Sequence, residues 1–442
     1  MKITNAWICK ISDKSVEPIF GDLVIKEGVI ADIIPTKHKD YLKARKVNRK
    51  NTYDAGGRVV TVPNVNYHDH IYSRLAKGVP IHGPLDNFSN ILSNLWWKLD
   101  NVLDADMIRA SAQYAVMDSI KNGVTYLFDH HSSPSNPQKS LFEIAKVIKK
   151  NKLRGVLAFE TTDRNGKTKS LKGLMENSEF SLNFTGQDIK SMFGLHASFT
   201  LKDETLKSVS KFIDENNLGI HIHLCEDPFD REVSVKDTGK LPLKRLMDFD
   251  LLNEKSILSH SIHITKNEMK QIAKYGSAVA VNIDSNMNNN VGLTKLASFE
   301  NSVPIIAGTD GMHSNPTRTL KNVFLLLRNS GQSFDDAFGI IIRIYFDQLN
   351  FVKRYYQDFP KLNKNDRADF IVWDYIPPTP LNKENYWGHY IYGMTESSIY
   401  GTFQHGENLM WEKKLTNINE VKTFKDIYTQ GEKLYKKMKR LK

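Results

Sequence analysis

Eight short apolar runs, separated by segments of helical periodicity, constrain the fold of this chain more than any other feature of its sequence. The runs cover residues 59–67, 123–131, 154–162, 191–198, 219–226, 256–264, 277–285 and 303–311. Strands buried on both faces are continuously apolar, and alternation with helices favours parallel pairing. Eight such units predict an α/β fold of the TIM-type (β/α)8 barrel class, with the active site at the carboxyl ends of the strands.

The segments between these runs repeat apolar residues at helical spacing. They predict helices over residues 105–121, 140–150, 202–215, 240–253, 266–274, 293–299 and 317–329, followed by one more at 335–349. The interval 165–184 is polar and irregular, so its helix is the least regular of the series.

Both ends of the chain have the alternating pattern of antiparallel strands. KEGVIADI near the start predicts a hairpin that turns at Gly28, and residues 404–407 predict a second hairpin turn near the end. We therefore expect a small composite β-sandwich domain built from both chain ends. The predicted parts are 1–58 for its N-terminal part, 59–360 for the barrel, and 361–442 for its C-terminal part plus a charged terminal helix.

The composition favours a protein of the cytoplasm over the other common classes. No stretch approaches the roughly 18 apolar residues of a membrane helix, and the first residues lack the apolar core of a signal peptide. Two cysteines, Cys9 and Cys225, are too few for a disulfide framework. The net charge of +11 is not accompanied by a nucleic-acid-binding motif, so we expect a lysine-rich solvated surface and neither a nucleic-acid nor a membrane partner.

The first barrel strand is followed by the sequence His68-Asp69-His70. Residues i and i+2 of an extended strand point to the same face, so both imidazoles converge on one point. Neutral imidazole is a common ligand of zinc and similar metals. A single His-x-His pair is weak evidence for a metal site, because most histidines are surface or hydrogen-bonded core residues.

Other predicted strand ends supply the groups that a metal site requires. The fifth strand ends in His223 and Glu226, the sixth carries His260 and His263, and the eighth ends in Asp310. Three histidines and one aspartate suffice to bind one divalent ion and leave room for a water, whose pKa the ion lowers to about 7. Glu226 is placed to move a proton from that water to a leaving nitrogen, and His260 to orient the hydroxide. The remaining histidines that we considered have no such support, namely His82, His131, His313, His389 and His405.

These residues resemble the amidohydrolase superfamily, in its cytosine deaminase, guanine deaminase and triazine hydrolase branch, over nearly the whole chain. GVTYLFDHH at 123–131 is similar to a G-x-T-x-x-x-D strand of that branch, and RADFIVWDY and GENLM are similar to its composite β domain. LWWKLD, GLHASFTL, SNMNNNVG and DYIPPTPL resemble the SsnA-type aminohydrolases, whose substrate is not settled. The resemblance therefore indicates a chemistry more sharply than a substrate.

The resemblance implies one metal ion, with zinc the first expectation and iron or manganese also compatible. It implies the ligands His68, His70, His223 and Asp310, the proton shuttle Glu226, the hydroxide partner His260 and the substrate-facing His196. The fourth strand lacks the lysine that bridges two metals in binuclear relatives, which favours a single ion. Trp97 is a further substrate-binding candidate, although an aromatic pair with Trp96 that caps the barrel is the simpler interpretation.

We expect hydrolytic deamination of a small nitrogen heterocycle, purine-like or related, with release of ammonia. Hydrolysis of a ring amide or halide at the same site is an alternative, as is a non-catalytic ligand-binding barrel. Two segments depart from the family pattern, 63–66 (PNVN) and 282–286 (NIDSN), and both bear on substrate geometry. A homodimer is a further expectation from the resemblance.

Overall fold

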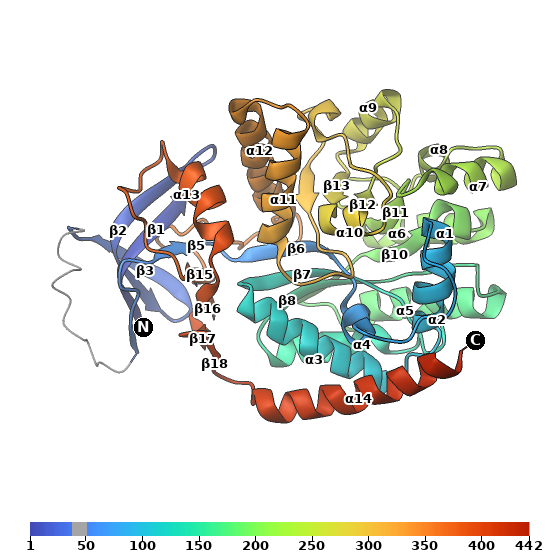
Figure 1. Cartoon of the computed structure of the whole chain (residues 1–442), viewed down its shortest axis with the longest axis horizontal. Helices are drawn as coiled ribbons and strands as arrows, with labels where there is room; N and C mark the ends of the chain where they lie inside the picture. The colour runs from blue at the N-terminus through green and yellow to red at the C-terminus, as the bar shows by residue number, and fades with distance from the viewer. Residues whose placement is uncertain (38–50, 442) are drawn as a thin grey trace.

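The computed structural model describes residues 1–37 and 51–441, and its central part contains two parallel β-sheets (Figure 1). The first sheet has the order β6-β7-β8-β9, and the second has the order β10-β11-β12-β13-β14. Their bounds are Asn64–Asp69 (β6), Val124–His131 (β7), Arg154–Phe159 (β8), Ile189–Ser191 (β9), Phe193–Ala197 (β10), Ile220–Leu224 (β11), Ile257–His260 (β12), Ala278–Val281 (β13) and Ile305–Ala307 (β14). Isolated parallel bridges, Asp69 to Asp310 and Thr161 to Leu195, connect the two sheets. The predicted α/β class is confirmed.

Helices flank both sheets, as the alternation in the sequence predicts (Figure 1). They are α1 (Phe88–Ile91), α2 (Trp97–Asp100), α3 (Ala105–Lys121), α4 (Ser140–Lys150), α5 (Lys167–Asn183), α6 (Asp203–Asn216), α7 (Pro228–Thr238), α8 (Pro242–Asp248), α9 (Lys266–Tyr275), α10 (Ile283–Asn288), α11 (Pro316–Asn329), α12 (Phe334–Val352), α13 (Tyr386–Tyr392) and α14 (Glu420–Arg440). Within the described residues, none is both long enough and apolar enough to span a bilayer.

Local signals explain several of these boundaries. The Asp104 side chain accepts the Met107 N–H at the start of α3, and Thr265 and Glu268 form a capping box at the start of α9. Helix α9 ends at Gly276, whose φ of 65° suits glycine.

The predicted helix over 240–253 is wrong in extent, because α8 spans only Pro242–Asp248. A separate helix that was not predicted, α7, precedes it: α7 begins at Pro228 after the N-cap Asp227 and ends at Thr238, with Gly239 as its C-cap. Proline fits the first turn of a helix, where its missing N–H has no partner to lose.

Two further predictions differ from the structure near the site. The predicted strand 277–285 ends at Val281, because the chain turns into helix α10 from Ile283. The predicted helix 293–299 is only a short 3-10 segment over Leu296–Ser298.

The polar interval 165–184 contains a long regular helix, α5. Its buried face is polar because Asn177 accepts the Phe159 N–H and donates to the Phe159 carbonyl, while Glu176 accepts N–H groups at the start of α4. Because polar side chains occupy much of the buried face, the sequence lacks the apolar residues at helical spacing that would have predicted this helix.

A third sheet combines strands from both ends of the chain (Figure 1). Its strands are β1 (Lys2–Ile11), β2 (Val16–Lys26), β3 (Val29–Pro35), β4 (Thr52–Asp54), β5 (Val59–Thr61), β15 (Phe370–Trp373), β16 (Ile399–Gln404), β17 (Glu407–Trp411) and β18 (Lys414–Leu415). Strand β5 pairs with β1 on one side and with β15 on the other. Both predicted hairpins are present, β2–β3 around Gly28 and β16–β17.

The predicted strand 59–67 is therefore two strands: one belongs to the third sheet and the other to the first parallel sheet. Val59–Thr61 belongs to the sheet of the chain ends, and β6 starts at Asn64, after Pro63. Proline has no N–H for a strand ladder, so the pairing changes at this point.

Candidate metal centre and active site

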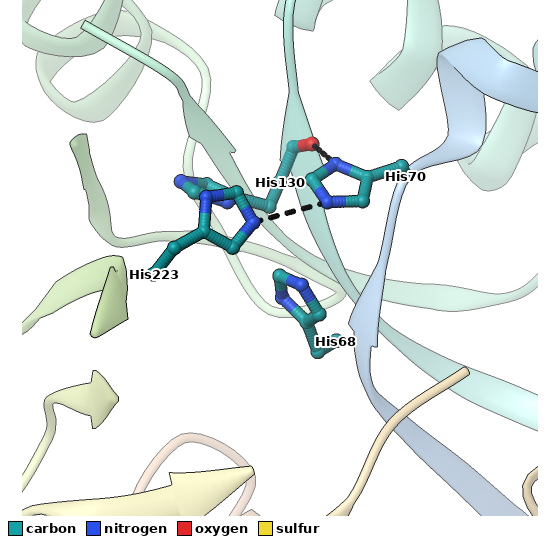
Figure 2. Close-up of side chains that lie close together, drawn as sticks. All are labelled: His68, His70, His130 and His223. Carbon is teal, nitrogen blue, oxygen red and sulfur yellow. Dashed lines mark hydrogen bonds between the residues drawn. The ribbon is translucent and has the colours of Figure 1, made fainter. Parts of the chain in front are cut away.

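Side chains from β6, β7 and β11 converge at the carboxyl ends of the strands (Figure 2). One ring nitrogen from each of His68, His70, His130 and His223 lies within 4.8 Å of the others, and His68, His260 and Asp310 form a second such group. The structure thus brings the four predicted metal ligands and the predicted partner His260 to one place, and it adds His130.

Backbone carbonyl groups fix the tautomers of His70 and His223. His70 Nδ1 lies 2.6 Å from the His130 carbonyl oxygen, and His223 Nδ1 lies 3.0 Å from that of His196. Because a carbonyl only accepts, both Nδ1 atoms carry a proton, so in the neutral form of each ring Nε2 presents a lone pair. These two Nε2 atoms face each other at 3.2 Å, as Figure 2 shows.

The remaining predicted ligands complete a donor set for a cation. Buried His68 Nε2 has no hydrogen-bond partner among the described residues, and it lies 3.9 Å from Asp310 Oδ1. The other nitrogen, His68 Nδ1, is 2.8 Å from His221 Nε2 and 3.0 Å from Ser259 Oγ. Converging lone pairs, an orphaned buried nitrogen and one carboxylate fit a divalent metal such as zinc.

Asp310 and His70 form a buried charged pair. Asp310 Oδ1 lies 3.1 Å from His70 Nε2. Burial opposes ionisation of both groups, but their contact prevails: the pKa of Asp310 lies well below its usual range, and the pKa of His70 rises to about 10. The position between them therefore favours a positive charge.

Glu226 and His260 lie beside this pair. His260 Nδ1 donates to Asn286 Oδ1 at 2.9 Å, so its Nε2 faces Glu226 Oε2 at 3.4 Å and Asp310 Oδ2 at 3.7 Å. Burial, reinforced by the Asp310 charge, raises the pKa of Glu226 well above its usual value. A raised pKa makes the Glu226 carboxylate a better proton acceptor, which suits general acid–base chemistry.

Left-handed backbone conformations occur at the ends of β11 and β12 and shortly after β14. Cys225, His260 and Asp310 have φ values of 49°, 69° and 55°, which residues other than glycine rarely adopt. Such strain persists where the surrounding structure enforces it, and it is frequent at functional sites.

The site opens into a cavity that is partly open to solvent. Its lining includes His70, His223, Glu226, Asp310, His196, Trp97, Phe199 and Arg164. His68 and His260 are not in the lining and are fully buried behind it. Both predicted substrate-binding residues, His196 and Trp97, thus face the same space as Glu226.

The orientation of His196 follows from its neighbour Thr200. The Thr200 hydroxyl donates to the Ala197 carbonyl, so it accepts the proton of His196 Nδ1 at 2.9 Å. His196 Nε2 is left as a hydrogen-bond acceptor at the cavity wall. Trp97 packs against Arg164, whose guanidinium carbon is 5.1 Å from the ring centre.

Sequence reasoning missed several residues around the site. His130 and His221 are fully buried beside the ligands, while Glu160 and the ion pair of Arg164 with Asp100 line the cavity. The signals were present: the histidine doublet at the end of the second predicted strand, and the first histidine of HIHLCE.

Other residues singled out in the sequence have structural partners. His263 Nε2 lies 2.7 Å from the Val291 carbonyl, and His131 Nε2 lies 2.8 Å from Ser133 Oγ. Both segments that depart from the family pattern support the site: Asn66 donates to Asp69, and Asn286 accepts from His260.

A model of the Amidohydrolase family matches residues 59–341 of the chain. Among curated proteins, a 5'-deoxyadenosine deaminase of Methanosphaera stadtmanae is 25% identical over 83% of this chain and 85% of that protein. A 5-methylthioadenosine/S-adenosylhomocysteine deaminase of Desulforudis audaxviator is 24% identical over 95% of each chain.

Solved structures share the fold over almost their whole length. Atrazine chlorohydrolase from Arthrobacter aurescens, complexed with zinc, superposes with a TM-score of 0.78 at 16% identity, covering 97% of this chain and 99% of that one. Guanine deaminase from E. coli superposes with a TM-score of 0.74 at 16% identity, covering 94% and 99%.

Proposed function

The chain belongs to the amidohydrolase family and is a metal-dependent hydrolase of carbon–nitrogen bonds, and we propose that it deaminates an amino-substituted purine nucleoside. The reaction class predicted from the sequence, hydrolytic deamination of a nitrogen heterocycle, is confirmed by relatives named as deaminases of adenosine derivatives. The observation that carries the proposal is the placement of Glu226 beside the converging ligands and in the wall of one cavity. The narrower likeness to SsnA-type aminohydrolases stays a prediction.

We propose one zinc ion, held by His68, His70, His223 and Asp310. The orphaned His68 Nε2 and the facing lone pairs of His70 and His223 support this set. The sequence FGLHA of β10 offers no bridging lysine, which supports a single ion. When bound, such an ion lowers the pKa of a coordinated water to about 7.

The chain's own residues then move the protons. Ionised Glu226 accepts a proton from the attacking water and delivers it to the departing amino nitrogen, so that a C–O bond forms, the C–N bond breaks and ammonia leaves. His260 Nε2, aimed at the space between Glu226 and Asp310, accepts a hydrogen bond from the water and orients it.

Recognition of the substrate falls to the cavity walls. The walls combine aromatic side chains with a few polar groups, as is typical of small-molecule sites. His196 Nε2 accepts a hydrogen bond from the substrate, and Trp97 stacks on an aromatic ring. The substrates printed for the archaeal and bacterial relatives make 5'-deoxyadenosine and 5'-methylthioadenosine the first compounds to try.

The two parallel sheets form one closed barrel in our proposal, with its catalytic unit over residues 59–360. The isolated bridges between the sheets support closure. The described parts of residues 1–58 and 361–442 form the composite β domain, with the terminal helix at the end of the second part. Strand β5, the first strand after residue 58, supports this because it pairs with both β1 and β15. The free, buried thiols of Cys9 and Cys225 support a reducing, cytoplasmic location. The homodimer and the lack of a nucleic-acid partner stay predictions.

The test is ammonia release by the zinc-loaded protein across a panel of compounds. The panel contains adenine, adenosine, 5'-deoxyadenosine, 5'-methylthioadenosine, guanine and a chlorinated triazine. We expect release from at least one adenosine derivative and none with Glu226→Gln at equal zinc content. Release of chloride from the triazine alone would overturn the deaminase proposal in favour of halide hydrolysis.

A further inference from the structure

His130, at the end of β7, is a fully buried histidine that the proposed mechanism does not use. Neither ring nitrogen has a hydrogen-bond partner among the described residues. Buried polar atoms without a partner are costly, and those that occur in native proteins call for an explanation.

The ring of His130 is held in a defined orientation. It stacks on the His221 ring, with centroids 4.5 Å apart and planes 14° from parallel. Its Nδ1 lies 3.5 Å from Glu160 Oε1. One ring nitrogen of His130 lies within 4.8 Å of nitrogens of His68, His70 and His223, and we assign Nε2 to this position because Nδ1 faces Glu160. Figure 2 shows the His130 ring beside that of His223.

This arrangement has the form that metal-binding histidines commonly take. One nitrogen faces a carboxylate, which fixes the tautomer and raises the basicity of the ring, while the other nitrogen faces the ion. The nitrogens of all four histidines lie within 4.8 Å of one another, a separation that small side-chain movements reduce to that of ligands on one ion.

We propose that His130 is a further ligand of the same metal ion, oriented by Glu160. The inference rests on the proposed metal centre but not on the proposed substrate. The ion then has four histidine ligands from β6, β7 and β11, with Asp310 completing the set.

The first test measures zinc affinity of the full-length protein by competition with a chelator, without any substrate. His130→Ala is expected to weaken zinc binding by about 100-fold. The loss of a residue that only supports a ligand typically weakens metal binding by about 10- to 100-fold, so the expected value lies at the upper end of that range. His131→Ala is the matched control, because His131 is the adjacent buried histidine and has Ser133 as its partner. Its affinity is expected to change less than about threefold.

The second test counts ligands by X-ray absorption of the zinc-loaded wild-type protein and of His130→Ala. We expect four imidazole ligands in the wild type and three in the variant. Three in the wild type, together with unchanged zinc affinity in the variant, would overturn the proposal.

A third variant covers the case in which His130→Ala does not fold. His130→Cys keeps a ligand at this position, so its cobalt-loaded form is expected to show a thiolate-to-cobalt charge-transfer band that the wild type lacks. A folded His130→Cys protein that binds cobalt without that band would contradict the assignment. Failure of the deaminase proposal would leave all three results unaffected, because none of them involves turnover.

Discussion

Nε2 of His70 and Nε2 of His223 face each other at 3.2 Å, and the opposite nitrogen of each ring is committed to a backbone carbonyl. The two carbonyls belong to His130 and His196, at the ends of β7 and β10, so neighbouring strands hold both rings in place. If either ring changed its tautomer, it would lose the buried hydrogen bond from its Nδ1 to a backbone carbonyl. The two Nε2 lone pairs repel each other when both rings are neutral, and a proton or a metal cation at this point removes that repulsion.

Zinc is therefore expected to stabilise the folded protein. At a free zinc concentration about 1,000 times Kd, mass action raises the free energy of unfolding by about 4 kcal/mol. Thermal unfolding with and without zinc measures the effect, and His223→Ala should remove most of it. An identical zinc-dependent shift in His223→Ala would show that the ion binds elsewhere.

Glu226→Gln is expected to lower kcat by about 10²- to 10⁴-fold, because the amide does not transfer protons. The amide has nearly the same shape as the carboxyl, and Glu226 is not among the proposed ligands, so zinc content should stay at the wild-type level. Steady-state ammonia release and metal analysis of the same sample test both statements. Wild-type turnover in this variant would remove Glu226 from the mechanism.

Asn286 is expected to act on catalysis through His260, whose Nδ1–H it accepts at 2.9 Å. Asn286→Leu removes the acceptor and should lower kcat by about 10- to 100-fold, as the loss of such supporting contacts commonly does. Asn286→Asp keeps an acceptor oxygen and should restore most of the activity. Equal loss in both variants would indicate a packing defect instead of a role in orienting His260.

A pH-dependent stability is expected from Glu176, far from the site on α5. Its carboxyl accepts the N–H groups of Lys139 and Leu141, and burial raises its pKa from 4.5 to about 7. Because the folded protein binds this proton more tightly than the unfolded chain, the stabilisation is complete below pH 4.5 and is lost as the pH rises through 7.

Urea unfolding of the wild type and of Glu176→Gln measures this contribution. The difference between their free energies of unfolding should change by about 2 kcal/mol from pH 5.5 to pH 8, to the disadvantage of the wild type. Parallel pH profiles would show that Glu176 keeps an ordinary pKa in the folded protein.

The sequence was sufficient to predict the residues at the strand ends, because parallel strands bring their carboxyl ends to one edge. His68 and His70 follow from the two-residue period of a strand, and His223, His260 and Asp310 follow apolar runs that are strands in the structure. These predictions depend only on the order of strands and helices, which the pattern of apolar residues predicts well.

Other features depend on tertiary contacts, which the pattern of apolar residues does not predict. Helix α5 buries Glu176 and Asn177 against backbone groups, so its inner face lacks an apolar period. The change of sheet after Thr61 depends on which strand pairs with β5. His130 differs from its neighbour His131 only in which side of β7 it faces, and that follows from the register of the sheet.

Ammonia release as a function of added zinc tests the central claim most directly. Metal-stripped protein would be titrated with zinc, and initial rates measured with saturating 5'-deoxyadenosine, or with whichever adenosine derivative the panel identifies. We expect negligible activity without metal, a linear rise of the rate with added zinc and a plateau at one zinc per chain. The rate of Glu226→Gln should stay negligible at every zinc level. Full activity in the stripped protein, or no ammonia at any zinc level despite stoichiometric binding, would contradict the central claim.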